Sequence, residues 1–195
     1  MKKISILISL LILTLQAQAQ LAHYQSQFNK INENLMLGLG SYAVSNFVLS
    51  GFSYVISQDE STKHFHEMNV MWNTVNLGLA VPGYLKAKRG GKELTLEEMI
   101  KEQKKTEIIF LVNDILDLGY IATGIWMKNE AVNQADRAAM YRGYGNSLIL
   151  QGSFLLALDA YAYYLHRNHA KQLPMLEKVS VHTIGTGLGV VITLD

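Results

Sequence analysis

The chain has 195 residues, of which 49% are hydrophobic and 17% are charged, and its formal net charge is +1. Ordinary soluble domains carry about 25% charged residues, so this composition indicates a large apolar core or contact with lipid. A net charge near zero gives no reason to expect nucleic acid as a partner. The sequence has no cysteine, which excludes disulfides, thiol nucleophiles and cysteine metal ligands, and its length favours one domain.

Residues 1–19 predict a secretory signal peptide. Two lysines follow the first methionine, residues 4–15 are apolar, and Ala17-Gln18-Ala19 has the small-x-small pattern of a cleavage site. Cleavage there leaves residues 20–195 as a single mature domain. The alternative is an uncleaved membrane anchor, although the apolar stretch is short for a membrane span. This segment predicts export to the envelope of a bacterial cell.

The first helix of the mature chain is expected at about residues 24–57. Its beginning is polar, with apolar residues at helical spacing, and residues 35–56 then contain no charged side chain. This apolar stretch exceeds the roughly 20 residues that cross a bilayer as a helix. Ser41 and Ser45 are four residues apart, a spacing of small side chains that lets two helices approach closely.

A second helix is expected at about residues 61–87, with Ser61 or Thr62 as its N-cap. Pro82-Gly83 is expected to kink or end this helix. Its charge-free centre carries three asparagines, and their helical spacing places them near one face: Asn69, Asn73 and Asn76.

The third helix is expected at about residues 95–128, and Thr95 and Glu98 have the spacing of a capping box at its start. It begins in the most charged part of the chain. The lysines and arginines there suit either anionic lipid headgroups or an ordinary solvated helix face. The helix then continues into residues 111–126, an apolar stretch that contains Asn113, Asp114 and Asp117.

The fourth helix is expected at about residues 135–172. Its charge-free centre is followed by Asp159 and by several tyrosines that suit a membrane interface, and Pro174 is expected to stop it. The tail, residues 176–195, is rich in β-branched residues and predicts one or two short strands. Its Gly185–Gly189 segment superficially resembles a phosphate-binding loop, but no helix follows to complete one.

Short turns make successive helices antiparallel neighbours. The expected fold is therefore all-α: an up-down four-helix bundle that spans a membrane, with a short β-like tail at the C-terminus. One observation opposes spanning. Cleavage of the signal peptide places the lysine-rich residues 86–105 outside the cytoplasm, against the positive-inside rule. The alternative is a periplasmic or membrane-associated bundle that does not cross the bilayer.

Carboxylate and amide side chains inside the apolar helices are the candidate functional residues. In an antiparallel bundle, Asp114 and Asp159 each lie about 10 Å inside the same end, because a helix rises about 1.5 Å per residue. Desolvating such carboxylates is costly unless they are paired, protonated or hydrated. We therefore expect a buried polar network, which either fixes the register of the helices or forms an ion site: Asp114, Asp117, Asp159, Asn76, Asn46 and Asn113.

Two pairs of histidines have spacings compatible with metal binding: His64 with His66, and His166 with His169. The antiparallel arrangement places the two pairs at opposite ends of the bundle, so they cannot form one site in a monomer. Exposed histidines in turns are the commoner case. No metal or other cofactor is therefore expected, and His166 and His169 are the residues to test for one. No arrangement of serine, histidine and acid indicates a hydrolase, so we expect a non-enzymatic protein.

Three segments of the helices, together with the signal peptide, resemble an uncharacterised bacterial family of small, signal-bearing four-helix envelope proteins, a domain of unknown function. The segments are WNTVNLGLA at 72–80, LVNDILDLGYIATG at 111–124 and YGNSLILQGSFLLALDAY at 144–161. The resemblance covers most of the mature chain. It implies no activity, cofactor or catalytic residue.

The sequence leads to two main hypotheses of function, beside a third, a metal-dependent enzyme at His166 and His169. The first is a non-enzymatic envelope protein, a membrane-integral or membrane-associated helical bundle with a structural or partner-binding role. Its expected partners are membrane lipid and a protein partner or a second copy of the chain. The alternative is a component of a cation- or proton-coupled transporter or channel that uses Asp114, Asp117 and Asp159.

Overall fold

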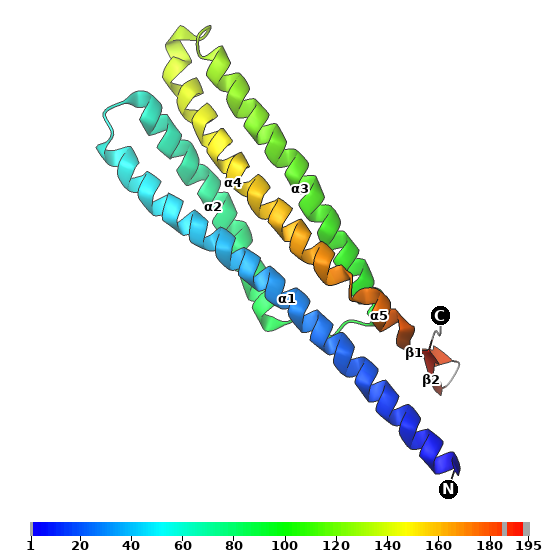
Figure 1. Cartoon of the computed structure of the whole chain (residues 1–195). Helices are drawn as coiled ribbons and strands as arrows, with labels where there is room; N and C mark the ends of the chain where they lie inside the picture. The colour runs from blue at the N-terminus through cyan, green and yellow to red at the C-terminus, as the bar shows by residue number, and fades with distance from the viewer. Residues whose placement is uncertain (1, 185–186, 193–195) are drawn as a thin grey trace.

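The computed structural model describes residues 2–184 and 187–192, and four long helices make up most of it (Figure 1). The expected all-α four-helix bundle is confirmed. The helices are α1 (Lys2–Ile56), α2 (Glu60–Arg89), α3 (Leu96–Glu130) and α4 (Ala138–Ala170), with a single 3-10 turn η1 (Ala135–Arg137) before α4. A short helix α5 (Leu173–Lys178) then leads into the strands β1 (Val179–Ile184) and β2 (Gly187–Ile192).

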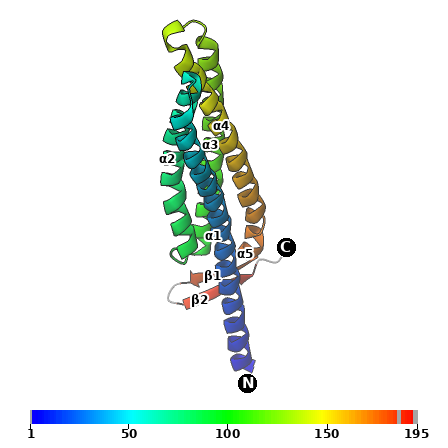
Figure 2. The ribbon, with the colours of Figure 1, turned by 90° about the vertical axis from the view of Figure 1, so that its left-hand side faces the viewer.

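The first helix is longer than expected, because it continues without a break through the predicted signal peptide. Its 55 residues correspond to a rod about 80 Å long. Figure 2 shows the N-terminal part of α1 projecting beyond the ends of the other helices, past the two strands. Cleavage after Ala19 remains a prediction, and the part of α1 that packs against α2 would remain after such cleavage.

Local sequence explains where the helices begin and end. The expected capping box of α3 is confirmed, since the Thr95 and Glu98 side chains bind each other's backbone N–H groups. The cap of α2 lies two or three residues earlier than expected: Asp59 fills that position, and its carboxylate accepts hydrogen bonds from the Thr62 hydroxyl and from the Thr62 N–H, each at 2.7 Å. These bonds hold the pKa of the Asp59 carboxyl below its usual value.

The two prolines do not lie at helix ends in the way that the sequence suggested. Pro82 lies inside α2, which continues to Arg89 and ends at Gly90, a residue with φ of 79° that favours glycine. At the other end of the chain, α4 stops at Ala170, and Pro174 is the second residue of α5, where a proline needs no backbone N–H.

The C-terminal strands form an antiparallel pair, with Val179 opposite Ile192 and Ile184 opposite Gly187. They contact the N-terminal half of α1 and lie across it in Figure 2. Part of the glycine-rich segment expected at Gly185–Gly189 and the last residues of the tail lie outside the described residues.

The four helices form two antiparallel hairpins, α1–α2 and α3–α4, which meet mainly through the contact between α2 and α4. We call the end of the bundle that holds the α2–α3 connection the near end, and the opposite end the far end. Apolar clusters occur in the near half, around Tyr24, Phe28 and Met99 and around Leu35 and Phe110. The remaining buried positions are mostly small or polar.

Burial in this bundle is the reverse of burial in a soluble protein. Large apolar side chains on the outer faces are exposed, among them Val55 (77%) and Ile115 (70%). Soluble helices instead turn apolar residues inward and polar residues outward. The buried polar or charged side chains are Ser50, Asn69, Asn73, Asn76, Gln103, Glu107, Asp117, Ser147, Gln151, Asp159, His166 and His169.

Candidate functional site

Most of the buried polar side chains, with the half-buried Asp114 and Asn32, fall into three groups at successive depths of the bundle; buried Ser50 lies apart from them, against His66. The carboxylate layer consists of Asp114 and Asp117 of α3 and Asp159 of α4. The amide cluster consists of Asn69, Asn73 and Asn76 of α2 with Ser147 and Gln151 of α4. The near-end cluster consists of Tyr24 and Asn32 of α1, Gln103 and Glu107 of α3, and His166 and His169 of α4.

The carboxylate layer brings together the three aspartates that the sequence singled out. Asp159 lies close enough to Asp117 and Asp114 for their charges to repel, and the Asn113 amide is directed at its carboxylate. Asp117 is 3% exposed and Asp159 is 9% exposed. The depth matching of Asp114 with Asp159, proposed from residue counting, agrees with this placement.

The chain packs tightly beside this layer because α4 has a glycine there. A Cβ added to Gly152 would lie 3.0 Å from the backbone oxygen of Asp117 and 3.0 Å from Cγ1 of Ile121. Small residues at such points let the backbones of two membrane helices approach closely. The close approach places Asp117 against α4, the helix that also carries Asp159.

The charges of the carboxylate layer have no basic partner. None of the ion pairs formed within the described part of the chain includes any of these aspartates. One buried oxygen of Asp114 and one of Asp117 also lack a hydrogen-bond partner. Three carboxylates cannot all remain charged in an apolar setting without a counter-charge, water or protons.

The amide cluster joins α2 to α4. The Asn69 side-chain oxygen accepts hydrogen bonds from Ser147 Oγ at 2.7 Å and from Gln151 Nε2 at 2.8 Å. Asn73 donates to the Asn69 backbone oxygen, and Asn76 donates to Asn73 Oδ1 at 3.4 Å. Asn76 therefore belongs to this cluster, and its hydrogen bond is to Asn73 rather than to a carboxylate.

The remaining amide from the sequence analysis, Asn46, is not joined to either group. Its Nδ2 donates to the backbone oxygen of Tyr42, one turn earlier in α1. Tyr42 itself stacks on Phe154 of α4, with ring centroids 3.4 Å apart. The contact between α1 and α4 at this depth is thus aromatic, and Asn46 satisfies its amide within its own helix.

The near-end cluster was not predicted as a unit. Tyr24 Oη donates to Gln103 Oε1 at 2.9 Å, and Gln103 Nε2 donates to Glu107 Oε1 at 3.0 Å and to the backbone oxygen of His166 at 2.7 Å. Arg167 forms an ion pair with Glu107 at 3.4 Å. Gln103 therefore links three helices from a fully buried position.

The two histidines of this cluster are held neutral. His166 Nε2 lies 3.2 Å from Asn32 Oδ1 and must donate to it, while the ring lies between Phe28 and Phe110. Burial, together with a smaller contribution from the neighbouring His169, lowers the pKa of His166 to about 4. The pKa of His169, whose ring stacks on Tyr24 at 3.9 Å, is also lowered, first by burial and then by His23.

Among the described residues, the histidines do not form a metal site. His166 Nδ1 and His169 Nε2 are buried without a partner, so each ring has a free lone pair. Protein zinc sites need three or four ligands, and no group of three or more suitable side chains occurs in the part of the chain that the structure describes. As expected from the antiparallel fold, His64 and His66 lie at the far end.

The signal that would have revealed the near-end cluster lies in α3. Gln103 and Glu107 are four residues apart and face α4, although they lie in the charged first half of the helix. The sequence alone is compatible with a solvated face or a contact with lipid headgroups in that half, because its glutamates and lysines are spaced four residues apart. A helical wheel of residues 96–107 would have separated Met99, Gln103 and Glu107 from the lysines.

Comparison with known proteins places the chain in a family. Residues 38–160 match a protein family described as a family of unknown function, DUF6992. The chain belongs to this family. No curated protein and no solved structure matches the chain. The DUF6992 region contains the whole carboxylate layer and amide cluster, whereas Tyr24, His166 and His169 of the near-end cluster lie outside it.

Proposed function

We propose that this protein is a non-enzymatic integral membrane protein of the bacterial envelope, with a structural or partner-binding role. The reversed burial pattern is the observation that carries the proposal. A continuous apolar outer face on a monomer of this size calls for lipid or a partner to cover it. Such a protein is surrounded by membrane lipid and uses no cofactor, and its net charge of +1 gives no reason to expect nucleic acid as a partner.

Three helices have stretches long and apolar enough to cross a bilayer: Leu15–Ile56, Leu96–Glu130 and Ala135–Ala170. The hairpin partner α2 is not among these helices, because its three asparagines lower its average hydropathy, although all three are buried. Its outer face is nevertheless apolar, since Met71, Val75 and Leu79 are exposed at four-residue spacing. Because α2 packs along α1, both helices cross the bilayer together in this proposal.

The charges of the chain are compatible with such a position. The last charged residue of α1 before its apolar stretch is Glu33, and the first after that of α2 is Lys86. On α3 and α4 the corresponding residues are Glu107 and Arg167, once the buried Asp114, Asp117 and Asp159 are set aside. These residues mark one membrane boundary near the near end, and the near-end cluster lies at that boundary and beyond it.

Alkaline carbonate extraction of membranes from producing cells tests the proposal. We expect the protein in the membrane pellet, as for proteins held by apolar burial in lipid. Recovery in the soluble fraction would show that the bundle does not span. The mass of the purified protein tests export, because cleavage of the signal peptide predicts a mature chain that begins at Gln20.

A second candidate function rests on the carboxylate layer. Intramembrane carboxylates without a basic partner are typical of ion and proton pathways, and Asp114 and Asp117 each have a buried oxygen without a hydrogen bond. The protein would then be a component of a cation- or proton-coupled transporter or channel. The other use of the same residues is to fix the register of α3 and α4.

Measuring proton or cation flux into proteoliposomes distinguishes transport from a structural role of these aspartates. In the transport case, D117N and D159N each abolish proton or cation flux measured with a pH-sensitive dye or an ion electrode. The control is D136N, at an exposed position in η1. Absence of flux in the wild-type protein, or equal flux in all variants, would remove the transporter function.

A further inference from the structure

The inner face of α4 carries polar side chains through most of the bundle. Tyr144, Ser147, Gln151, Asp159 and His166 follow one another at spacings that place them on one side of the helix. The last four of these residues are buried. One apolar layer interrupts the series, and we call it the plug. The plug consists of Leu35 of α1, Phe110 of α3 and Ala162 of α4, which pack together as one buried cluster.

The plug separates the carboxylate layer from the near-end cluster on each helix that contributes to it. Along α3, Phe110 lies between Glu107 and the carboxylate layer. Along α4, Ala162 lies between the carboxylate layer and His166. Leu35 follows the part of α1 that belongs to the near-end cluster. The three plug residues are at most 8% exposed, and an apolar constriction of this kind excludes water and gates ion passage.

Buried polar atoms without a hydrogen-bond partner occur on both sides of the plug. On the near side they are Gln27 Oε1, His166 Nδ1 and His169 Nε2, and on the far side Tyr42 Oη, Asp114 Oδ1, Asp117 Oδ2 and Gln151 Oε1. Asp117 and Gln151 are each more than nine-tenths buried. Buried polar atoms of this kind normally bind water. These atoms therefore indicate two hydrated regions, with the plug between them.

The far-side region continues to the surface of the far end. Asp117 packs against α4 beside Gln151. From there α4 presents Ser147 and then Tyr144, so a hydrogen-bonding side chain occurs at each turn over about 10 Å. The Tyr144 hydroxyl donates to Glu67 at 2.9 Å, and the Glu67 side chain is 40% exposed. We call this series, together with the amide cluster, the polar column.

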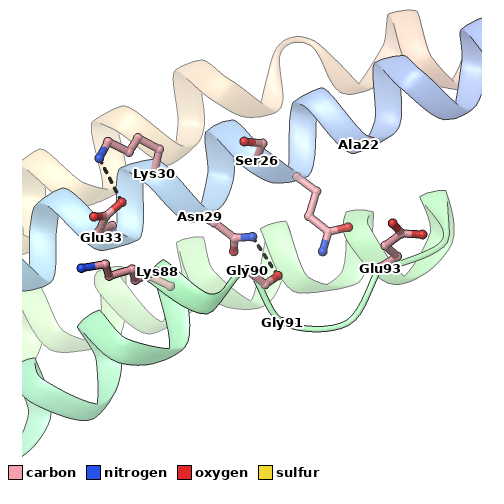
Figure 3. Close-up of a pocket in the computed structure, with 11 residues that line it drawn as sticks. Ala22, Ser26, Asn29, Lys30, Glu33, Lys88, Gly90, Gly91 and Glu93 are labelled. Atoms are coloured by element: carbon pink, nitrogen blue, oxygen red, sulfur yellow. Dashed lines mark hydrogen bonds and ion pairs between the residues drawn. The ribbon is translucent and has the colours of Figure 1, made fainter.

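On the near side, solvent comes close to the plug. Figure 3 shows the polar hollow between α1 and the end of α2, which has a volume of about 390 Å³. Asn29 donates to the Gly90 oxygen across this hollow at 3.1 Å, and Lys30 pairs with Glu33 at 2.9 Å. Glu33 lies two residues before Leu35, so solvent reaches within about one turn of the plug along α1.

A proton is the ion that this arrangement suits. A bound metal ion requires several oxygen ligands around one point, and among the described residues no three acidic or histidine side chains come close enough to share one. A proton needs only one carboxylate oxygen and water that hydrogen-bonds to it. The amide and hydroxyl side chains of the polar column both donate and accept hydrogen bonds, so they can hold that water.

We propose that the bundle contains a proton half-channel, in which the carboxylate layer exchanges protons with the far end through the polar column and is closed from the near end by the plug. A proton from far-end water binds one carboxylate oxygen and neutralises one negative charge of the layer. It reaches the near-end cluster only when the plug opens. This inference rests on the proposed membrane location, and it deepens the second candidate function by naming the ion, the side of access and the gate.

Proton entry into proteoliposomes that contain a pH-sensitive dye tests the inference, with a potassium diffusion potential as the driving force. F110A removes the ring that fills the plug, and A162S adds a hydroxyl to the plug with little change in volume. We expect F110A to raise the initial rate at least about tenfold above the wild-type rate, a barrier change of about 1.4 kcal/mol. A162S should raise it less, and D159N combined with F110A should return it to near the wild-type rate.

The matched control is F154A, which removes a phenylalanine ring from α4 outside the plug, where it stacks on Tyr42; it should leave the rate unchanged. Equal rates in the wild type, F110A and A162S would overturn the inference, as would a leak that F154A shares or that D159N does not reduce. Wild-type flux that D159N abolishes and F110A does not raise would support the transporter but contradict the plug as its gate. If the protein stays in the carbonate-resistant pellet, these failures concern the half-channel alone; extraction by carbonate would overturn the membrane proposal itself.

Discussion

The histidines of the near-end cluster make the stability of the protein depend on pH. His166 is fully buried and its pKa is lowered to about 4 in the folded protein, mainly by burial. In the unfolded chain a histidine has a pKa near 6.5. Between those values the unfolded state binds more protons than the folded state, so acidification favours unfolding.

We therefore expect the melting temperature in detergent to fall as the pH is lowered from about 7 to about 4, with a loss of up to about 3 kcal/mol from His166. Circular dichroism at 222 nm measures the transition. H166Q should be less stable at neutral pH, because the packed ring is lost, but should show a shallower pH dependence. H64Q, at a partly exposed site of the far end, is the control. An unchanged pH slope in H166Q contradicts this account.

Sequence reasoning at the residue scale identified the buried carboxylates because a charge inside an apolar helix is visible without a structure. It could assign depth to Asp114 and Asp159 from residue counting. It could not assign hydrogen-bond partners, because a helix of known depth can still rotate about its axis. For that reason Asn76 was paired with the carboxylates, whereas its bond is to Asn73.

At the scale of elements, the contact between α3 and α4 near the far end depends on two glycines. A Cβ added to Gly145 would lie 2.7 Å from the backbone oxygen of Gly124 and 2.8 Å from Cγ of Lys128. Such distances are shorter than any ordinary contact, and one of the opposing atoms belongs to the backbone. The two helices can approach this closely only without a side chain at that position.

G145A should therefore destabilise the bundle by about 1–3 kcal/mol, the usual range for an overpacked contact. G119A makes the same change on α3 where a Cβ meets nothing within 4 Å, and it should be neutral or slightly stabilising because alanine favours a helix. Thermal unfolding of both variants in the same detergent measures the difference. Equal melting temperatures for the two variants would contradict the close packing at Gly145.

The existence and type of the elements followed from sequence because charge-free stretches, capping residues and glycines mark helices directly. Thr95 with Glu98 located the start of α3. The proline signals were less informative, since Pro82 is accommodated inside α2 and Pro174 begins α5 rather than ending α4. Whether a proline breaks a helix depends on its neighbours, which supply the compensating contacts and are known only from the structure.

At the scale of the whole molecule, the two ends of the bundle should lie on opposite sides of the membrane. The chain has no cysteine, so single cysteines can be placed at will. Q58C reports the far-end turn and E93C the near-end loop, both at exposed positions. With a cleaved signal peptide, a membrane-impermeant maleimide should label E93C in intact spheroplasts, and Q58C only after lysis.

The other possible labelling patterns of Q58C and E93C would contradict parts of this topology. Labelling of Q58C alone would place the basic near end in the cytoplasm, as the positive-inside rule requires, and would contradict signal-peptide cleavage. Equal labelling of both cysteines in intact spheroplasts would contradict spanning. Labelling of E93C would show that the near end lies outside the cytoplasm. The signal peptide would then determine the topology, against the orientation that the lysines and arginines favour.

The contact of α2 with α4 through the amide cluster bears on how the protein is assembled. The ribosome completes the α1–α2 hairpin before α4 exists, so in the proposed membrane location Asn69, Asn73 and Asn76 would first meet lipid without Ser147 and Gln151 as partners. Exposed amides in lipid retain or recruit other polar groups. The newly made first hairpin is therefore incomplete, because the Asn69 side-chain oxygen gains its α4 partners only when the second hairpin is made.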